Sequence, residues 1–191
     1  MSTRDWAIRH NAGRKKSLQG PLFPDKSSLM KVLFALVVLS FFLPLMGYRV
    51  NLTPSMPVGV YQISHGPVER GRLAAFCLED TEFTPLAHRY IGSGSCPSGL
   101  RPLLKEVAGL PDDVIGFRDG LITLNGQVIA GTSLMKSDST GRPAPVSRLT
   151  PGIIPPGKAL MLSHYPGSFD GRYFGLVPVA GLNPVVQVLT F

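Results

Sequence analysis

The sequence predicts a mainly β domain, built on a coiled β-sheet, behind one N-terminal transmembrane helix. Two observations carry this prediction. The 191 residues include 21 glycines and 18 prolines, which favours turns and short strands over a helical bundle. One long apolar segment precedes residue 50, and after it the apolar runs are short, many alternate, and none has a helical period. About 140 residues then remain for one compact domain with its own core.

The N-terminal helix is expected over Leu29–Tyr48, where no charged residue occurs after Lys31. About 17 uncharged residues is the lower limit for crossing a bilayer, and Lys31 can extend the span by snorkelling. The basic flank predicts that residues 1–28 form a cytoplasmic tail. Residues 49–191 would then form a domain across the membrane, which in a bacterium means an inner-membrane protein with a periplasmic domain.

Two other interpretations of this segment remain. A cleaved signal peptide has the same basic and apolar regions, although no clear small-x-small exit precedes Asn51. A buried core helix is the other, although a helix that is apolar all round suits a small domain poorly.

The net charge of +7 belongs mostly to the tail. Residues 1–31 hold seven Lys/Arg and two Asp/Glu, which gives +5, and the other 160 residues hold twelve and ten, which gives +2. A nucleic-acid-binding protein has its basic residues clustered on a folded face, interleaved with aromatic residues. We therefore expect no nucleic-acid partner.

Cys77 and Cys96 are the only cysteines, and an oxidising periplasm would let them pair. A bridge would close a loop of about 20 residues and contribute ~3 kcal/mol. The alternative is two small buried apolar side chains. No paired-cysteine or paired-histidine pattern accompanies them, so we expect no metal site.

Eight apolar runs are expected to form strands, separated by Gly or Pro clusters. The segment Leu121–Ile129 has the pattern of a hairpin around Asn125-Gly126. The stretch Glu79–Arg101 is expected to be an irregular insertion. The runs are Gly59–Ile63, Arg72–Leu78, Leu103–Ala108, Val114–Arg118, Leu121–Leu124, Gln127–Ile129, Ala159–Ser163 and Val185–Leu189.

Ser55 and Lys105 are the candidates for chemistry. Ser55 lies in a turn bracketed by prolines, a few residues from the expected membrane span. Lys105 lies inside the apolar run Leu103–Ala108, where burial would lower the pKa of its ammonium group. A neutral lysine beside a serine can take the hydroxyl proton, as in the Ser-Lys variants of the serine triad.

Three segments together resemble the signal peptidase I family. The nucleophile motif Ser-Met-x-Pro of that family is similar to Ser55-Met-Pro57, and its Lys-Arg-Val-x-Gly-Leu-Pro-Gly-Asp motif is similar to Lys105–Asp113. The end of its last motif, Ser-x-Asp-Ser-Arg, resembles Ser168-Phe-Asp-Gly-Arg172. A weaker motif, Gly-Asp-x-Val-x-Phe, resembles Gly71–Phe76.

Two features indicate a subgroup of that family. The order Ser-Met-Pro-x-Gly-x-Tyr over Ser55–Tyr61, with the two-cysteine insertion, resembles the TraF-type conjugal-transfer peptidases encoded with plasmid mating machinery. That resemblance implies a pilin precursor as substrate, and processing in that group can end in head-to-tail cyclisation. Arg72 stands where the weak motif has Asp, and Asp112 stands where the lysine motif has Gly.

The resemblance implies a serine peptidase that needs no cofactor. Ser55 would be the nucleophile and Lys105 the general base. The Ser55 backbone N–H and the Thr53 hydroxyl would stabilise the oxyanion. The wider alternatives are a general type I signal peptidase that removes leader peptides, and a non-catalytic bitopic assembly protein of a conjugation or secretion channel.

The last motif implies supporting roles. Asp170 matches an aspartate that supports the dyad, and we expect its main contact to be Arg172, with any link to Lys105 running through a hydrogen bond from Ser168. The alternative is a plain turn aspartate, because Asp-Gly is a common turn pair.

Two other sets of residues match known catalytic patterns in part. Ser133 and Lys136 match Ser-x-x-Lys, but the companion motifs of penicillin-binding enzymes are absent. A Ser-His-Asp triad would need His65, His88 or His164, and no Gly-x-Ser-x-Gly elbow is present.

Overall fold

The computed structural model describes residues 25–79, 81 and 83–191, so most of the basic tail expected over 1–28 lies outside the described residues. The elements in chain order are α1 (Lys26–Leu45), β1 (Tyr48–Asn51), β2 (Gly59–Ile63), β3 (Leu73–Phe76), α2 (Thr84–Ile91), β4 (Leu103–Gly109), β5 (Val114–Arg118), β6 (Leu121–Leu124), β7 (Gln127–Val128), β8 (Gly152–Ile153), β9 (Lys158–Leu162), α3 (Gly171–Phe174), β10 (Val177–Pro178), a 3₁₀ turn (Val179–Gly181) and β11 (Asn183–Thr190).

The helix α1 is long and apolar enough to cross a membrane, and it is the one such helix in the described part of the chain. It begins three residues before the expected span, where the Asp25 carboxylate accepts a hydrogen bond from Ser28 N at 3.0 Å. Tyr48, the last residue of the expected span, instead opens β1. None of the residues of α1 is buried, which disfavours the interpretation as a core helix.

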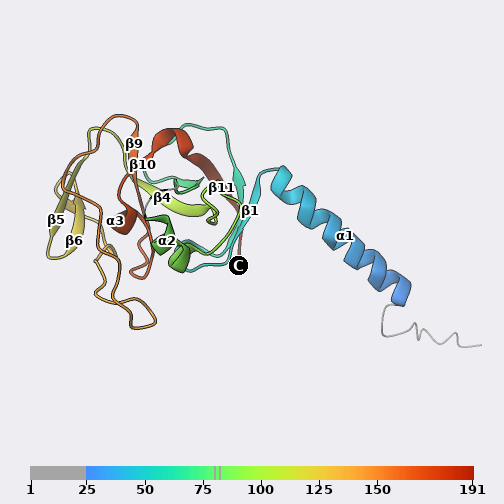
Figure 1. Cartoon of the computed structure of the whole chain (residues 1–191). Helices are drawn as coiled ribbons and strands as arrows, with labels where there is room; N and C mark the ends of the chain where they lie inside the picture. The colour runs from blue at the N-terminus through green and yellow to red at the C-terminus, as the bar shows by residue number, and fades with distance from the viewer. Residues whose placement is uncertain (1–24, 80, 82) are drawn as a thin grey trace, which may run out of the picture. The chain divides into compact units, whose positions relative to one another are not determined.

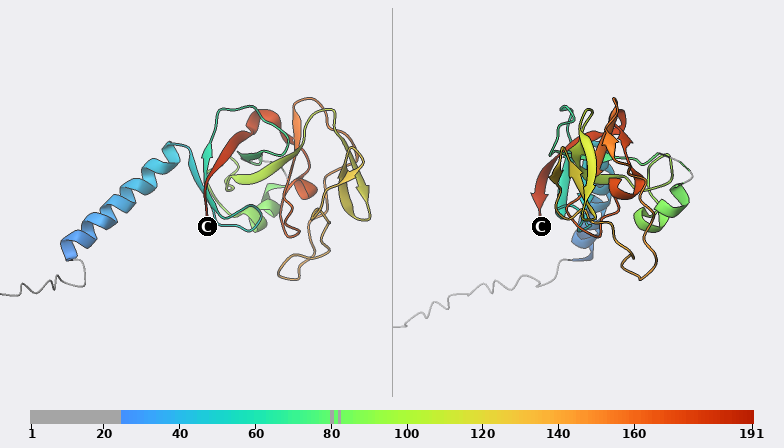
Figure 2. Two further views of the ribbon diagram at one scale, coloured as in Figure 1. Left: turned by 180° about the vertical axis from the view of Figure 1, so that it is seen from behind. Right: turned by 90° about the vertical axis from the view of Figure 1, so that its left-hand side faces the viewer.

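Two antiparallel sheets make up the domain (Figure 1). The larger has the strand order β1-β2-β11-β3-β4-β9-β10 and the smaller has the order β7-β6-β5-β8. Figure 1 and the left view in Figure 2 place the small sheet at the opposite end of the domain from β1. The mainly β prediction is therefore confirmed.

The strand β4 is central to the fold because it joins β3 on one side and β9 on the other. Its residues alternate, and Lys105, Val107 and Gly109 are buried on one face. The β4–β9 register shifts between Val107 and Gly109. A Cβ added to Gly109 would lie 2.7 Å from Ile154 Cδ1. A side chain at this bulge would therefore force the buried Ile154 side chain to shift.

Every expected apolar run contains a strand, and the hairpin lies where it is expected. The β6–β7 turn places Asn125 at φ 52° and Gly126 at φ 79°, the left-handed pair that a two-residue type I′ turn requires. The strands β1, β8 and β10 are not among the expected runs. The strand β1 directly follows the long apolar segment, and β8 and β10 have two residues each with no Asn-Gly turn beside them.

The insertion Glu79–Arg101, which is expected to be irregular, contains the helix α2 of eight residues. A second short helix, α3, has four residues. A helix of two turns shows few repeats of its pattern in the sequence, and Gly92 ends α2. Cys77 and Cys96 form a disulfide with an S–S distance of 2.07 Å, and this bridge closes the insertion at its base.

Candidate active site

The loop between β1 and β2 carries Ser55, and the side chain of Asn51 organises it. The Asn51 amide donates to the carbonyls of Thr53, Met56 and Pro57 at 3.0, 2.9 and 3.1 Å. Its carbonyl oxygen accepts from Thr53 N at 3.2 Å and from Thr53 Oγ1 at 2.7 Å. These contacts satisfy carbonyls of the loop, which lies between the paired strands β1 and β2. Asn51 was not predicted, although it ends β1 only four residues before Ser55.

Two further residues of the nucleophile motif fix the end of this loop. A Cβ on Gly59 would collide with the carbonyl oxygen of Leu189 in β11, so only glycine permits the close pairing of β2 with β11. Tyr61 is fully buried and its hydroxyl donates to Pro57 O at 2.6 Å. The spacing Ser-Met-Pro-x-Gly-x-Tyr therefore has a local structural reason.

Lys105 extends from β4 to the nucleophile. Its Nζ lies 2.9 Å from Ser55 Oγ, although the two residues are 50 positions apart. Its side chain is buried, and Ser55 is its one hydrogen-bond partner among the residues that the structure describes. An ammonium group has three donors, so a single partner in a buried place favours the neutral amine.

Burial lowers the pKa of the Lys105 ammonium to about 8. The negative charge of Asp170 opposes this change in pKa and the positive charge of Arg172 adds to it. At pH 7 roughly a tenth of the molecules therefore carry a neutral Lys105 that can accept the Ser55 proton.

Asp170 and Arg172 form a fully buried ion pair. The guanidinium donates to both carboxylate oxygens, through Nε at 2.7 Å and through Nη2 at 2.9 Å. Its remaining donors reach backbone carbonyls, which include Gly131 O at 3.0 Å and Pro166 O at 3.1 Å. Asp170 also caps α3 by accepting from Arg172 N at 3.1 Å. A buried ion pair is tolerable only when its polar atoms are satisfied in this way.

Ser163, which was not predicted as a site residue, joins this pair to the nucleophile. Its hydroxyl donates to the carbonyl of Ser55, and its backbone N–H donates to Asp170 Oδ2 at 3.0 Å. Arg172 Nη2 donates to Ser163 O at 2.7 Å. The one signal in the sequence is its position at the end of the apolar run Ala159–Ser163.

The expected hydrogen bond from Ser168 to Lys105 is not formed. Ser168 is buried, and in the described part of the chain its Oγ has no hydrogen-bond partner. Lys105 Nζ is directed at Ser55 instead.

Next to Ser168, the Phe169 ring stacks on Tyr90 of α2 with centroids 5.0 Å apart. The insertion therefore packs directly against the segment that contains Asp170.

Thr53 lies where an oxyanion donor is expected, beside the nucleophile. Its Oγ1 is 3.2 Å from Ser55 Oγ, and Thr53 is exposed. Because a hydroxyl has one proton, Thr53 cannot donate to Asn51 and to a developing oxyanion at the same time.

The chain is similar to known proteins over nearly all of its described residues. The family described as signal peptidase, peptidase S26, matches residues 26–190. The chain belongs to this signal peptidase family. The S26 chain is 34% identical over 150 residues to the conjugal transfer protein TraF of Agrobacterium fabrum, covering 76% of this chain and 84% of the relative. It is 34% identical over 144 residues to a plasmid transfer protein TraF of Escherichia coli, covering 74% and 81%.

Among solved structures, the chain is similar to a signal peptidase I from Enterococcus faecalis V583, with 21% identity and a TM-score of 0.39 over 65% of this chain and 100% of that one. The predicted family and its TraF-type subgroup are confirmed by the family match and the TraF relatives.

The competing patterns of this S26 chain do not form comparable sites. Lys136 is exposed, in contrast to Lys105. Among the described residues, none of His65, His88 and His164 has a serine hydroxyl as hydrogen-bond partner. No group of three or more His, Cys, Asp and Glu side chains in the same residues is placed to hold a metal.

Proposed function

We propose that this chain is a membrane-anchored serine endopeptidase with a Ser-Lys dyad that processes a pilin precursor for conjugative transfer. The observation that carries the proposal is the buried Lys105 amine 2.9 Å from Ser55 Oγ, in a chain of the signal peptidase family. The TraF relatives, named as conjugal and plasmid transfer proteins, support conjugation as the setting.

The proposed reaction is acyl transfer. The Ser55 hydroxyl attacks the carbonyl carbon of the scissile bond while neutral Lys105 accepts its proton. Thr53 and the Ser55 backbone N–H stabilise the oxyanion once Thr53 Oγ1 turns from Asn51. Lys105 then returns the proton to the leaving nitrogen, and an ester to Ser55 remains. Water or an amine breaks this ester, and attack by the amino group of the same pilin would close a ring.

Asp170 supports this chemistry without acting as a base. It is held by Arg172 and it fixes Ser163, whose hydroxyl holds the Ser55 carbonyl. Its charge raises the pKa of Lys105, which is opposite to what a base requires.

The proposed location is the bacterial inner membrane, with α1 as the anchor and the β domain in the periplasm. The basic N-terminal flank supports this orientation, and the disulfide between Cys77 and Cys96 supports an oxidising compartment.

The decisive experiment compares dyad variants on membranes that contain candidate pilin precursors. We expect Ser55→Ala and Lys105→Ala each to reduce processing by more than about 10³-fold, and the double variant to be no worse, since the two residues act as one unit. Ser133→Ala and Lys136→Ala are the matched controls and should process normally.

Intact mass of the product separates the alternatives. Loss of one water relative to the hydrolysed product reveals cyclisation. Processing of exported precursors in general would favour a general signal peptidase. Conjugation that survives Ser55→Ala unchanged would indicate a non-catalytic assembly protein and would overturn the proposal.

A further inference from the structure

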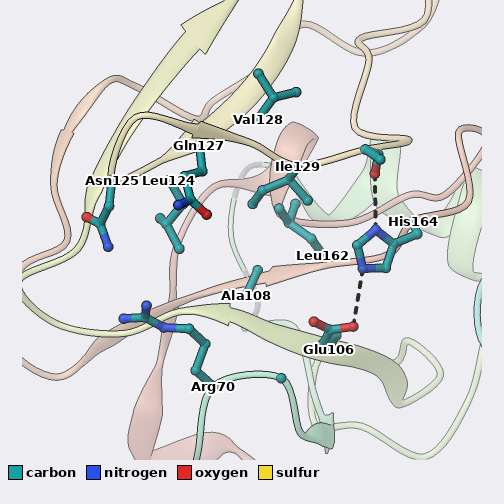
Figure 3. Close-up of a pocket in the computed structure, with 12 residues that line it drawn as sticks. Arg70, Glu106, Ala108, Leu124, Asn125, Gln127, Val128, Ile129, Leu162 and His164 are labelled. Carbon is teal, nitrogen blue, oxygen red and sulfur yellow. Dashed lines mark hydrogen bonds and ion pairs between the residues drawn. The ribbon is translucent and has the colours of Figure 1, made fainter.

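Two adjoining hollows lie at the site. The nucleophile hollow, about 580 Å³, is lined by residues that include Ser55 and Met56. The distal hollow, about 610 Å³, lies beyond it (Figure 3). Glu106 and His164 line both, so a polypeptide bound at Ser55 can continue past this pair into the distal hollow.

The distal hollow has an apolar wall and one carboxylate in its lining. Glu106 Oε2 lies 3.5 Å from His164 Nε2, as the dashed line in Figure 3 marks, and the Glu106 side chain is 30% exposed. Arg70 lies across the hollow and is already paired with Asp113. The apolar lining comprises Ala108, Leu124, Val128, Ile129, Ala130 and Leu162. The hollow therefore suits a short apolar peptide segment with a positive charge at the Glu106 end.

The position of the hollows indicates which half of a substrate enters. In β4, Glu106 and Ala108 follow Lys105, and in the loop Met56 and the next two residues follow Ser55. The anchor and β1 precede Ser55 in the chain. The distal hollow is lined by Leu124 of β6, and Figure 1 places β6 at the opposite end of the domain from β1, so this hollow extends from the dyad toward the end away from β1. Glu106 lines both hollows beside the dyad, and only the leaving half of the substrate gains a new amino group on cleavage, so the charge of this carboxylate fits the leaving half.

We propose that the distal hollow binds the first residues of the polypeptide that follow the scissile bond, and that Glu106 binds the amino group which cleavage releases. This inference rests on the proposed peptidase function.

The released amino group becomes charged in two proton transfers. The bond from Ser55 Oγ to the carbonyl carbon forms and the carbon–nitrogen bond breaks. The hydroxyl proton passes through Lys105 to the leaving nitrogen, which gives a neutral amine. This amine takes a second proton from water and becomes the ammonium group that Glu106 accepts. An N-acetylated peptide lacks that charge.

The test measures binding to the full chain in detergent micelles, in a Ser55→Ala background where turnover cannot interfere. The probes are the amidated tetrapeptide Ala-Leu-Val-Ala with a free amino terminus, and the same peptide with an acetylated terminus. The readout is the methyl NMR signals of Leu124, Val128 and Leu162. We expect the free-amine peptide to shift these signals and to bind about tenfold more tightly than the acetylated peptide.

In Glu106→Gln the preference for the free amine should fall below about twofold, because the isosteric amide removes the charge. Glu69→Gln is the control, since Glu69 is an exposed carboxylate outside both hollows. Equal affinities for the two peptides, or a tenfold preference that survives Glu106→Gln, would overturn the inference. The binding test needs no turnover, so its result is independent of the peptidase assay. If the native chain cleaves no precursor while the preference for the free amine is intact, the proposed function alone is refuted.

Discussion

Replacing Lys105 by methionine should inactivate the protein and yet stabilise its fold at neutral pH. Methionine keeps an unbranched side chain of similar length and removes the amine from a site that is only 3% exposed. In the native protein the ammonium pKa is lowered from 10.5 to about 8, chiefly by burial. The folded state therefore disfavours the charged form that prevails at pH 7.

The magnitude follows from that difference in pKa. The two pKa values differ by about 2.5, and a difference of one in pKa corresponds to about 1.36 kcal/mol. Below pH 8 the native protein therefore loses ~3 kcal/mol of stability. The variant also loses the hydrogen bond to Ser55, worth ~1 kcal/mol. We expect a net gain of about 2 kcal/mol at pH 6.5, or about 4–8 °C in Tm.

The sign of the pH dependence is fixed by the same pKa values. Between pH 8 and 10.5 the unfolded chain still binds a proton at Lys105 that the folded chain has released, so the native protein gains stability as pH rises. The advantage of the variant should therefore shrink by ~2 kcal/mol between pH 6.5 and 9.5.

The assay is unfolding of the full chain in detergent micelles, followed by circular dichroism. Lys136→Met, at an exposed lysine, is the control and should show no such trend. A Lys105→Met protein less stable than native at pH 6.5, or a difference that does not change with pH, would refute the reasoning.

Three other predictions follow from the site and its surroundings. Asp170→Asn should cost ~3 kcal/mol of stability by breaking a buried ion pair. It should also lower the pH midpoint of kcat/KM relative to the native protein, because the Asp170 charge raises the pKa of Lys105; a midpoint that stays or rises would contradict this. Replacing Cys77 and Cys96 by serine should lower the free energy of unfolding by ~3 kcal/mol in a denaturant titration and abolish sensitivity to reductant; unchanged stability would show that the bridge does not constrain the unfolded chain. A reporter that fluoresces only in the cytoplasm, fused after Phe191, should stay dark, and bright cells would reverse the orientation.

The sequence by itself determined the elements that depend on neighbouring residues. Apolar runs between Gly and Pro clusters marked eight of the strands, and Asn125-Gly126 marked the hairpin turn. The motifs also singled out Ser55 and Lys105, because their residue types and spacing follow the family pattern. The sequence did not reveal the strands β1, β8 and β10 or the two-turn helix α2. The strand β1 directly follows the long apolar segment, and the other three elements contain too few repeats to show a period.

The tertiary structure alone decided which polar groups meet around the dyad. Ser163 donates to the Ser55 carbonyl across 108 positions of sequence, and that contact exists because β9 pairs with β4 in one register and ends beside the nucleophile loop. The same register brings His164 to Glu106. A one-residue slip would turn these side chains to the opposite face of the sheet. Such contacts depend on long-range strand pairing, which no local pattern of residues specifies.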